Sequence, residues 1–212
     1  MIRTTKVRGH KRIQRKIKKW TASKKNINIS DFLANQYDYV YLDIEPYCNI
    51  SIGNTNFSEP KGKTRKDIIW GLEEIYNNWK IELDKLGIEY FLKIYLFESN
   101  ISKSQVICSI GDKIGYYENY FRRIDVSKKI LNFHKMLNSD FIWESYSDDF
   151  IYSEKELLTS IEYYAGKEDC NYSIRFLQKL KNSNYTKIEV NTDDGLDNLY
   201  YVPKGIVWIG GK

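Results

Sequence analysis

The chain has 212 residues, of which 42% are hydrophobic, 29% charged and 15% aromatic. A chain of this length buries about 70% of its unfolded surface, so it can form a core without disulfides or metals. The composition excludes collagen-like repeats and wholesale disorder, and no apolar run approaches the roughly 18 residues of a membrane span. The net charge is +5, but residues 1–25 hold 11 of the 33 Lys and Arg residues and no acid, so the other 187 residues carry 22 basic against 28 acidic side chains.

The cysteines and the N-terminus indicate the compartment. Cys48, Cys108 and Cys170 are far apart, and no pair has the short spacing of a metal or redox site. The basic N-terminus has no apolar segment behind it, unlike a secretory signal. We therefore expect unpaired thiols in a reducing cytoplasm, and neither a cofactor nor a structural metal.

Residues 1–25 are predicted to form a basic N-terminal arm, with a helix from His10 to Trp20 and a polar connector over 21–30. Ile13, Ile17 and Trp20 recur at helical spacing and form one apolar stripe. The arm has three possible uses: to bind nucleic-acid phosphates, to lie on an anionic membrane through the stripe, or to dock on the acidic body. We favour docking, because three large apolar side chains need a hydrophobic cover. The basic residues that a nucleic acid would contact are Arg8, Lys11, Arg12, Arg15, Lys16, Lys18 and Lys19.

A strand is predicted over 37–45, followed by Pro46 and a short second strand over 48–53. The period of two places Tyr37, Tyr39, Tyr41, Asp43 and Glu45 on one face, and Asp38 with the apolar residues on the other. Tyr combines a large apolar ring with a polar tip, which suits a partly hydrated interface. A second aromatic cluster contains Tyr116, Tyr117 and Tyr120.

The clearest element is a long helix over 65–86, with Thr64 as its N-cap and Gly87 as its stop signal. Its apolar positions recur at alternating steps of four and three residues, at Ile68, Leu72, Ile75, Trp79, Leu83 and Leu86. The strand predicted over 90–97 is apolar on both faces, which is typical of a central strand beneath a helix.

The rest of the chain predicts alternating short elements. The strands are a hairpin of 105–110 with 116–122, a strand over 141–146, a hairpin of 185–190 with 199–202, and a strand over 206–209. The helices lie over 126–137, from the capping box of Ser153 and Glu156 to Gly166, and over 170–180. We therefore predict an α+β fold: a mainly antiparallel sheet packed on one long helix, a basic N-terminal helical arm, and a C-terminal helical pair and hairpin. Residues 31–212 would form a single domain beside the arm over 1–25.

Several short patterns point to chemistry but are better interpreted as structural. Residues 61–64 end like a phosphate-binding loop, but Phe57 occupies the position of the required first Gly. Oxygen-bearing residues alternate through the turn at 191–197, where the Asp-Gly step already explains a hairpin. Cys108 and His134 could form a nucleophilic pair, but no local sequence supports it.

These patterns favour a cytoplasmic, non-enzymatic protein-binding domain, in its most specific form a bacterial immunity or antitoxin protein that neutralises a toxin domain such as a nuclease. An acidic, Tyr-rich face would complement a basic partner. The residues predicted to bind this partner are Tyr37, Asp38, Tyr39, Tyr41, Asp43, Glu45, Tyr116, Tyr117 and Tyr120. The alternatives are a nucleic-acid-binding protein that uses the basic arm, and a metal-dependent nuclease that uses Asp43 and Glu45.

Overall fold

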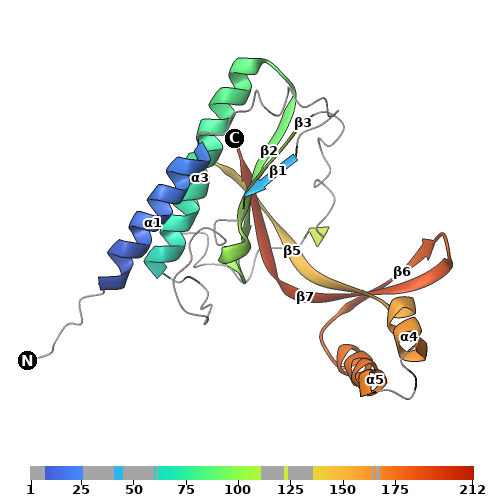
Figure 1. Cartoon of the computed structure of the whole chain (residues 1–212). Helices are drawn as coiled ribbons and strands as arrows, with labels where there is room; N and C mark the ends of the chain where they lie inside the picture. The colour runs from blue at the N-terminus through green and yellow to red at the C-terminus, as the bar shows by residue number, and fades with distance from the viewer. Residues whose placement is uncertain are drawn as a thin grey trace, which may run out of the picture. The chain divides into compact units, whose positions relative to one another are not determined.

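The computed structural model describes residues 8–25, 41–44, 60, 62–110, 122–123, 136–163, 165 and 168–212 (Figure 1). The chain divides into two compact units, one of Met1–Tyr146 with Ile206–Lys212 and one of Ser147–Gly205. Helices combine with a mostly antiparallel sheet, which confirms the predicted α+β class. The division into an arm and one domain over 31–212 stays a prediction. No helix among the described residues is long and apolar enough to cross a membrane.

Among the described residues, the first unit contains the helices α1 (Arg8–Lys25) and α3 (Gly62–Leu86). α1 continues through residues 21–25, so the connector expected there is helical in its first half. α3 begins at Gly62, which has a positive φ of 54°, and the prediction of Thr64 as N-cap is therefore wrong. The predicted stop is confirmed at Gly87, whose φ of 65° lies in the left-handed region that favours glycine.

Seven strands form one sheet in the order β1-β3-β2-β7-β5-β4, with β6 paired to β7. The strands are β1 (Tyr41–Ile44), β2 (Tyr90–Phe97), β3 (Gln105–Ile110), β4 (Arg122–Arg123), β5 (Ile142–Ser153), β6 (Thr186–Thr192) and β7 (Gly195–Gly211), and a short 3-10 helix, η2 (Ile101–Lys103), precedes β3. β2 lies between β3 and β7, antiparallel to both, with Leu92 opposite Cys108 and Leu96 opposite Trp208. The predicted central strand is confirmed.

The core of the first unit lies between α3 and the sheet. Leu72, Ile75 and Trp79 of α3 are buried with Ile94 and Leu96, because alternate residues of β2 point to the helix. The other face of β2 carries Phe91 and Tyr95, which form a second buried cluster. Both faces of β2 are therefore buried, as its continuous apolar sequence predicts.

Several predicted strands differ from the observed ones in their pairing or their length. The hairpin of 105–110 with 116–122 is wrong, because β1 and β2 occupy both edges of β3. The strand expected over 141–146 continues to Ser153, and the strands expected over 199–202 and 206–209 are one continuous strand, β7. The helix expected over 126–137 lies almost entirely outside the described residues.

The second unit contains α4 (Glu154–Tyr163), α5 (Glu168–Lys181) and the β6–β7 hairpin. The predicted cap is confirmed, because the Glu156 amide donates to Ser153 Oγ at 3.1 Å. Ser153 Oγ in turn donates to Asp197 Oδ2 at 2.6 Å, and the Lys155 amide donates to Asp197 Oδ1 at 3.1 Å. These bonds hold the pKa of Asp197 below its ordinary value and join the start of α4 to β7. The predicted turn is also confirmed, since Thr192 pairs with Gly195, whose φ is 94°.

Candidate functional site

α1 lies alongside α3 (Figure 1) and contributes its apolar stripe to the core. Ile17 is 0% exposed and Trp20 4% exposed, and Ile13 packs against the same cluster. The predicted docking of the arm on the body is thereby confirmed. Because the stripe is buried, it is not available to enter a membrane.

The C-terminal end of α1 is held by side chains of α3. The last carbonyl groups of a helix have no partner within it and need outside donors. Trp79 Nε1 donates to the Lys24 carbonyl at 2.9 Å, and Asn78 Nδ2 donates to the Lys25 carbonyl at 2.8 Å. Lys25 also forms an ion pair with Glu74. These contacts fix the position and the rotation of α1.

Gly71 allows the two helices to approach closely. A Cβ atom at this position would lie 2.6 Å from Thr21 Oγ1 and 3.4 Å from the Trp20 ring. Glycine within a helix costs about 1 kcal/mol relative to alanine. Its presence here is explained by the contact with α1, which any larger residue would obstruct.

Docking leaves a basic face of α1 exposed. Successive helical residues are about 100° apart, so the exposed basic residues cover a continuous arc of about 120° away from the buried stripe. This basic face consists of Lys11, Arg12, Arg15, Lys18 and Lys19. Within the described part of the chain no ion pair joins any of them to an acid, and α1 itself contains no acidic residue. The docked helix therefore presents a cluster of cations at fixed positions.

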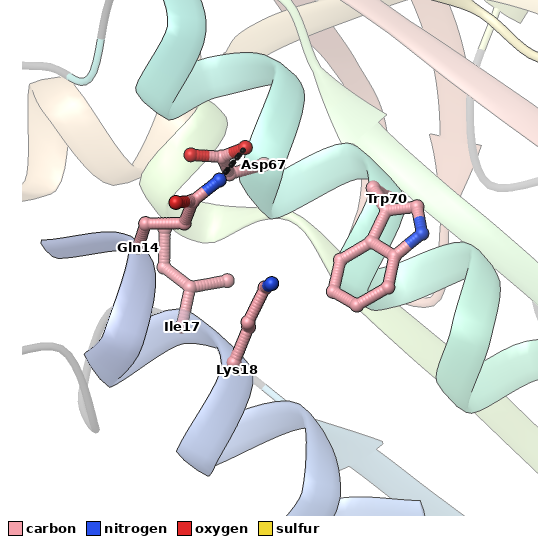
Figure 2. Close-up of a pocket in the computed structure, with 5 residues that line it drawn as sticks. All are labelled: Gln14, Ile17, Lys18, Asp67 and Trp70. Carbon is pink, nitrogen blue, oxygen red and sulfur yellow. Dashed lines mark hydrogen bonds between the residues drawn. The ribbon is translucent and has the colours of Figure 1, made fainter. Parts of the chain in front are cut away.

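A pocket of about 200 Å³ adjoins this basic face, between α1 and α3 (Figure 2). Gln14, Ile17 and Lys18 line it from α1, and Asp67 and Trp70 from α3. Gln14 Nε2 donates to Asp67 Oδ1 at 3.4 Å, a long hydrogen bond. In Figure 2 the Lys18 side chain rises between this polar pair and the Trp70 ring.

Of the pocket residues, the sequence identified Lys18 as a basic candidate and Ile17 as part of the docking stripe, but not Gln14, Asp67 or Trp70. Trp70 lies off the apolar stripe of the long helix, and a large aromatic residue on the polar face of an amphipathic helix is the signal that could have identified it. Gln14 and Asp67 carry no comparable signal, because single polar residues are ordinary on exposed helix faces.

Of the residues predicted to bind nucleic acid, all seven lie in α1. The five residues of the basic face are described above; Lys16 is half-buried on another flank, and for Arg8 only the backbone is described. Of those predicted to bind a protein partner, Tyr41 and Asp43 lie in β1, where they pair with Ser109 and Ile107 of β3. The other predicted partner-binding residues lie outside the described part of the chain: Tyr37, Asp38, Tyr39, Glu45, Tyr116, Tyr117 and Tyr120.

The structure does not support the nucleophilic or the metal-binding sites that the sequence suggested. Burial raises the pKa of Cys108 to about 12, so its thiol is a poor nucleophile at neutral pH, and His134 lies outside the described residues. The carboxylate of Asp197 is engaged by Ser153 and by backbone amides rather than turned to a cation. Within the ranges that the structure describes, no three His, Cys, Asp or Glu side chains are grouped to hold a metal.

Glu73 is the one acid of α3 that is buried, 8% exposed. Burial raises its pKa, an effect that hydrogen bonding to Asn138 and the charge of Lys212 oppose. A raised carboxyl pKa can mark an active site. The groups that act on the Glu73 carboxyl are Asn138, Lys212 and Asp140. The contact with Asn138 has a structural explanation, since it attaches the segment before β5 to α3.

Large exposed apolar residues are concentrated in the second unit. Seven of the eleven such residues in the described part of the chain lie within Ser147–Gly205: Phe150, Ile151, Leu158, Tyr163, Ile174, Ile188 and Leu196. α4 has no buried residue. A contiguous apolar patch marks a surface that contacts another protein, so the second unit is where such a contact would be sought.

Comparison of the chain with protein-family models, with curated proteins and with solved structures finds no match in any of the three.

Proposed function

We propose that the chain is a nucleic-acid-binding protein whose basic face on α1 contacts the phosphate backbone. The observation that supports the proposal most is the arrangement of Lys11, Arg12, Arg15, Lys18 and Lys19 on the exposed side of a helix whose opposite side is buried against α3. Lys and Arg groups that neutralise phosphates release counterions, and this release supplies most of the affinity of non-specific nucleic-acid binding.

A docked helix is better prepared to bind a nucleic acid than a flexible basic tail would be. The backbone of a docked helix is already ordered before binding, whereas a disordered arm loses backbone entropy at that moment. The cations of the basic face are not neutralised by ion pairs to the acidic side chains that the structure describes. They therefore remain available to a polyanion although the rest of the chain carries more acidic than basic residues.

The test is a salt titration of binding to a labelled single-stranded oligonucleotide. Lys11→Gln/Arg15→Gln/Lys19→Gln removes three charges from the basic face, and Gln has a helix propensity close to those of Lys and Arg. We expect weaker binding and a slope of log affinity against log salt that falls by about 2, since each lost contact to a single strand removes about 0.7.

The matched control, Lys85→Gln/Lys103→Gln/Lys179→Gln, removes the same charge from exposed positions outside α1. We expect it to retain the wild-type slope. Equal effects of the two variants would show that net charge, and not the face of α1, governs binding, and would contradict the proposal.

The apolar surface of the second unit favours a second function, binding of a protein partner. We propose that Leu158 and Leu196, which are exposed in α4 and β7, belong to that surface. The most specific form of this proposal is an immunity or antitoxin protein that neutralises a toxin domain, with the acidic, Tyr-rich residues around β1 facing a basic partner. In this form the chain is not an enzyme.

The second function is tested by isolating the tagged chain with its partner from its own cells and identifying the partner by mass spectrometry. Leu158→Ser/Leu196→Ser should lose the partner. Ile81→Ser/Leu86→Ser, which alters exposed apolar residues of α3, should retain it. Recovery of the same partner with both variants would contradict an interface on the second unit.

A further inference from the structure

Trp70 exposes 42% of its surface although its neighbours Ile69 and Gly71 are buried. A Trp side chain gains much when it is buried, so an exposed indole on a well-packed helix is not explained by the fold. It also lies beside the basic face rather than at a distance from it, because Lys18 lines the same pocket. Lys66 is exposed four residues before Trp70, one helical turn along the same face of α3.

The size of the pocket limits what it can hold. Its volume of about 200 Å³ is below the roughly 300–1,000 Å³ of sites that enclose a whole small molecule. The pocket therefore suits one group of a larger ligand whose remainder lies outside. The basic face of α1 supplies a surface for that remainder.

The charges in the pocket select the kind of group. The Asp67 carboxylate would repel a phosphate, whereas it can accept hydrogen bonds from the amino or imino groups of a base. Gln14 adds an amide with both a donor and an acceptor, and its long bond to Asp67 costs little to exchange for a bond to a ligand. An uncharged, flat and polar-edged group suits the space between this pair and the Trp70 ring, once the Lys18 side chain that rises into it turns outward to a flanking phosphate.

On the basis of the proposed function, we propose that this pocket receives one unstacked base, which stacks on Trp70 while Lys18 and the rest of the basic face contact the flanking phosphates. Aromatic stacking combined with a basic track is how single strands are bound, since every base has a π-face and duplex bases are already stacked. The protein should therefore prefer single-stranded to double-stranded nucleic acid.

The experiment measures binding of a short labelled oligodeoxycytidine, whose amino groups suit Asp67, and of a duplex of the same length. Trp70→Ala should weaken single-strand binding by about 5- to 150-fold, the effect of losing one base–aromatic stack, and leave duplex binding and the salt slope unchanged. Trp70→Phe keeps an aromatic surface and should retain most of the affinity. Ile81→Ala is the control, because Ile81 is also a large exposed apolar residue of α3 but does not line the pocket.

Tryptophan fluorescence gives a second readout. The oligonucleotide should quench the emission of the wild type, and the quenching should be lost in Trp70→Phe although binding persists. Equal weakening of single-strand and duplex binding by Trp70→Ala, or no weakening of either, would overturn the base pocket. If the α1 charge variant still loses affinity in that case, nucleic-acid binding stands and only the pocket fails. Trp70-dependent binding to anionic lipid vesicles, without binding to the oligonucleotide, would overturn both.

Discussion

The contact of α1 with α3 can be tested at Gly71, where the two helices approach most closely. Gly71→Ala places a Cβ atom 2.6 Å from the hydroxyl of Thr21, well inside van der Waals contact. Overpacking of this kind costs about 1–3 kcal/mol, and the better helix propensity of alanine offsets about 1 kcal/mol. We therefore expect the substitution to destabilise the protein, although the same change in an exposed helix would stabilise it.

Thr21→Ala removes the atom that obstructs the new methyl group. Thr21 is 3% exposed, and no group among the described residues hydrogen-bonds its hydroxyl. Its loss should be nearly neutral, because removing a buried hydroxyl that has no partner offsets the lost methyl contact. In this background Gly71→Ala should stabilise by about 1 kcal/mol, which gives a coupling energy of about 2 kcal/mol between the two positions.

The assay is urea denaturation of the wild type, the two single variants and the double variant, followed by far-UV circular dichroism. The slope of the free energy of unfolding against urea should be the same for all four, so that the midpoints report stability. If Gly71→Ala changes the free energy of unfolding equally in the wild type and in the Thr21→Ala variant, the two helices do not approach closely at Gly71. The fixed orientation of the basic face would then be refuted as well.

Three further outcomes follow from the structure. Leu72→Ala, in the core, should cost about 2–5 kcal/mol in urea denaturation, whereas Ile81→Ala, 54% exposed, should change stability by no more than about 0.5 kcal/mol; equal costs would contradict the observed face of α3. The pKa of Asp197 is lowered from 3.8, mainly by the hydrogen bond from Ser153, so the ionised carboxylate stabilises the fold above pH 3.8 and this stabilisation is lost as the pH falls. Asp197→Asn should lower the melting temperature at neutral pH and make the melting temperature depend less on acid pH. A variant with the same acid dependence as the wild type would contradict the role of Asp197. Cys108 should resist thiol reagents in the native protein and react on unfolding. Because burial raises the pKa of Cys108 from 9.0 to about 12, the folded protein should become less stable as the pH rises between these values. The same alkaline loss of stability in a Cys108→Ala variant would show that other groups cause it.

Much of the fold could be predicted because its periodic patterns are long. The stripe from Ile68 to Leu83 indicates the buried face of α3, although not the residue at which the helix begins, and the Asp-Gly step at the start of β7 indicates the late hairpin. Strand partners were harder to predict. Residues 105–110 are followed by a turn sequence that suggests a local hairpin, whereas β3 pairs with β1 and β2 instead, and these long-range pairings depend on packing that no local pattern encodes.

The candidate site could be predicted only in part, for a similar reason. The basic residues and the apolar stripe of α1 belong to one local helical pattern, so both faces were apparent in the sequence. The pocket forms between residues far apart in the sequence, Gln14 and Lys18 on one helix and Asp67 and Trp70 on another. Its existence depends on how closely α1 approaches α3, which Gly71 permits and which the sequence of neither helix specifies alone.

We propose that α1 contacts nucleic acid while it is docked on α3. Ultraviolet cross-linking of the intact chain to a single-stranded oligonucleotide, followed by mass spectrometry of the linked peptides, reports which residues touch the strand. We expect cross-links within Arg8–Lys25 and at Trp70, and their loss when salt displaces the strand. Cross-links confined to the second unit, Ser147–Gly205, would contradict it.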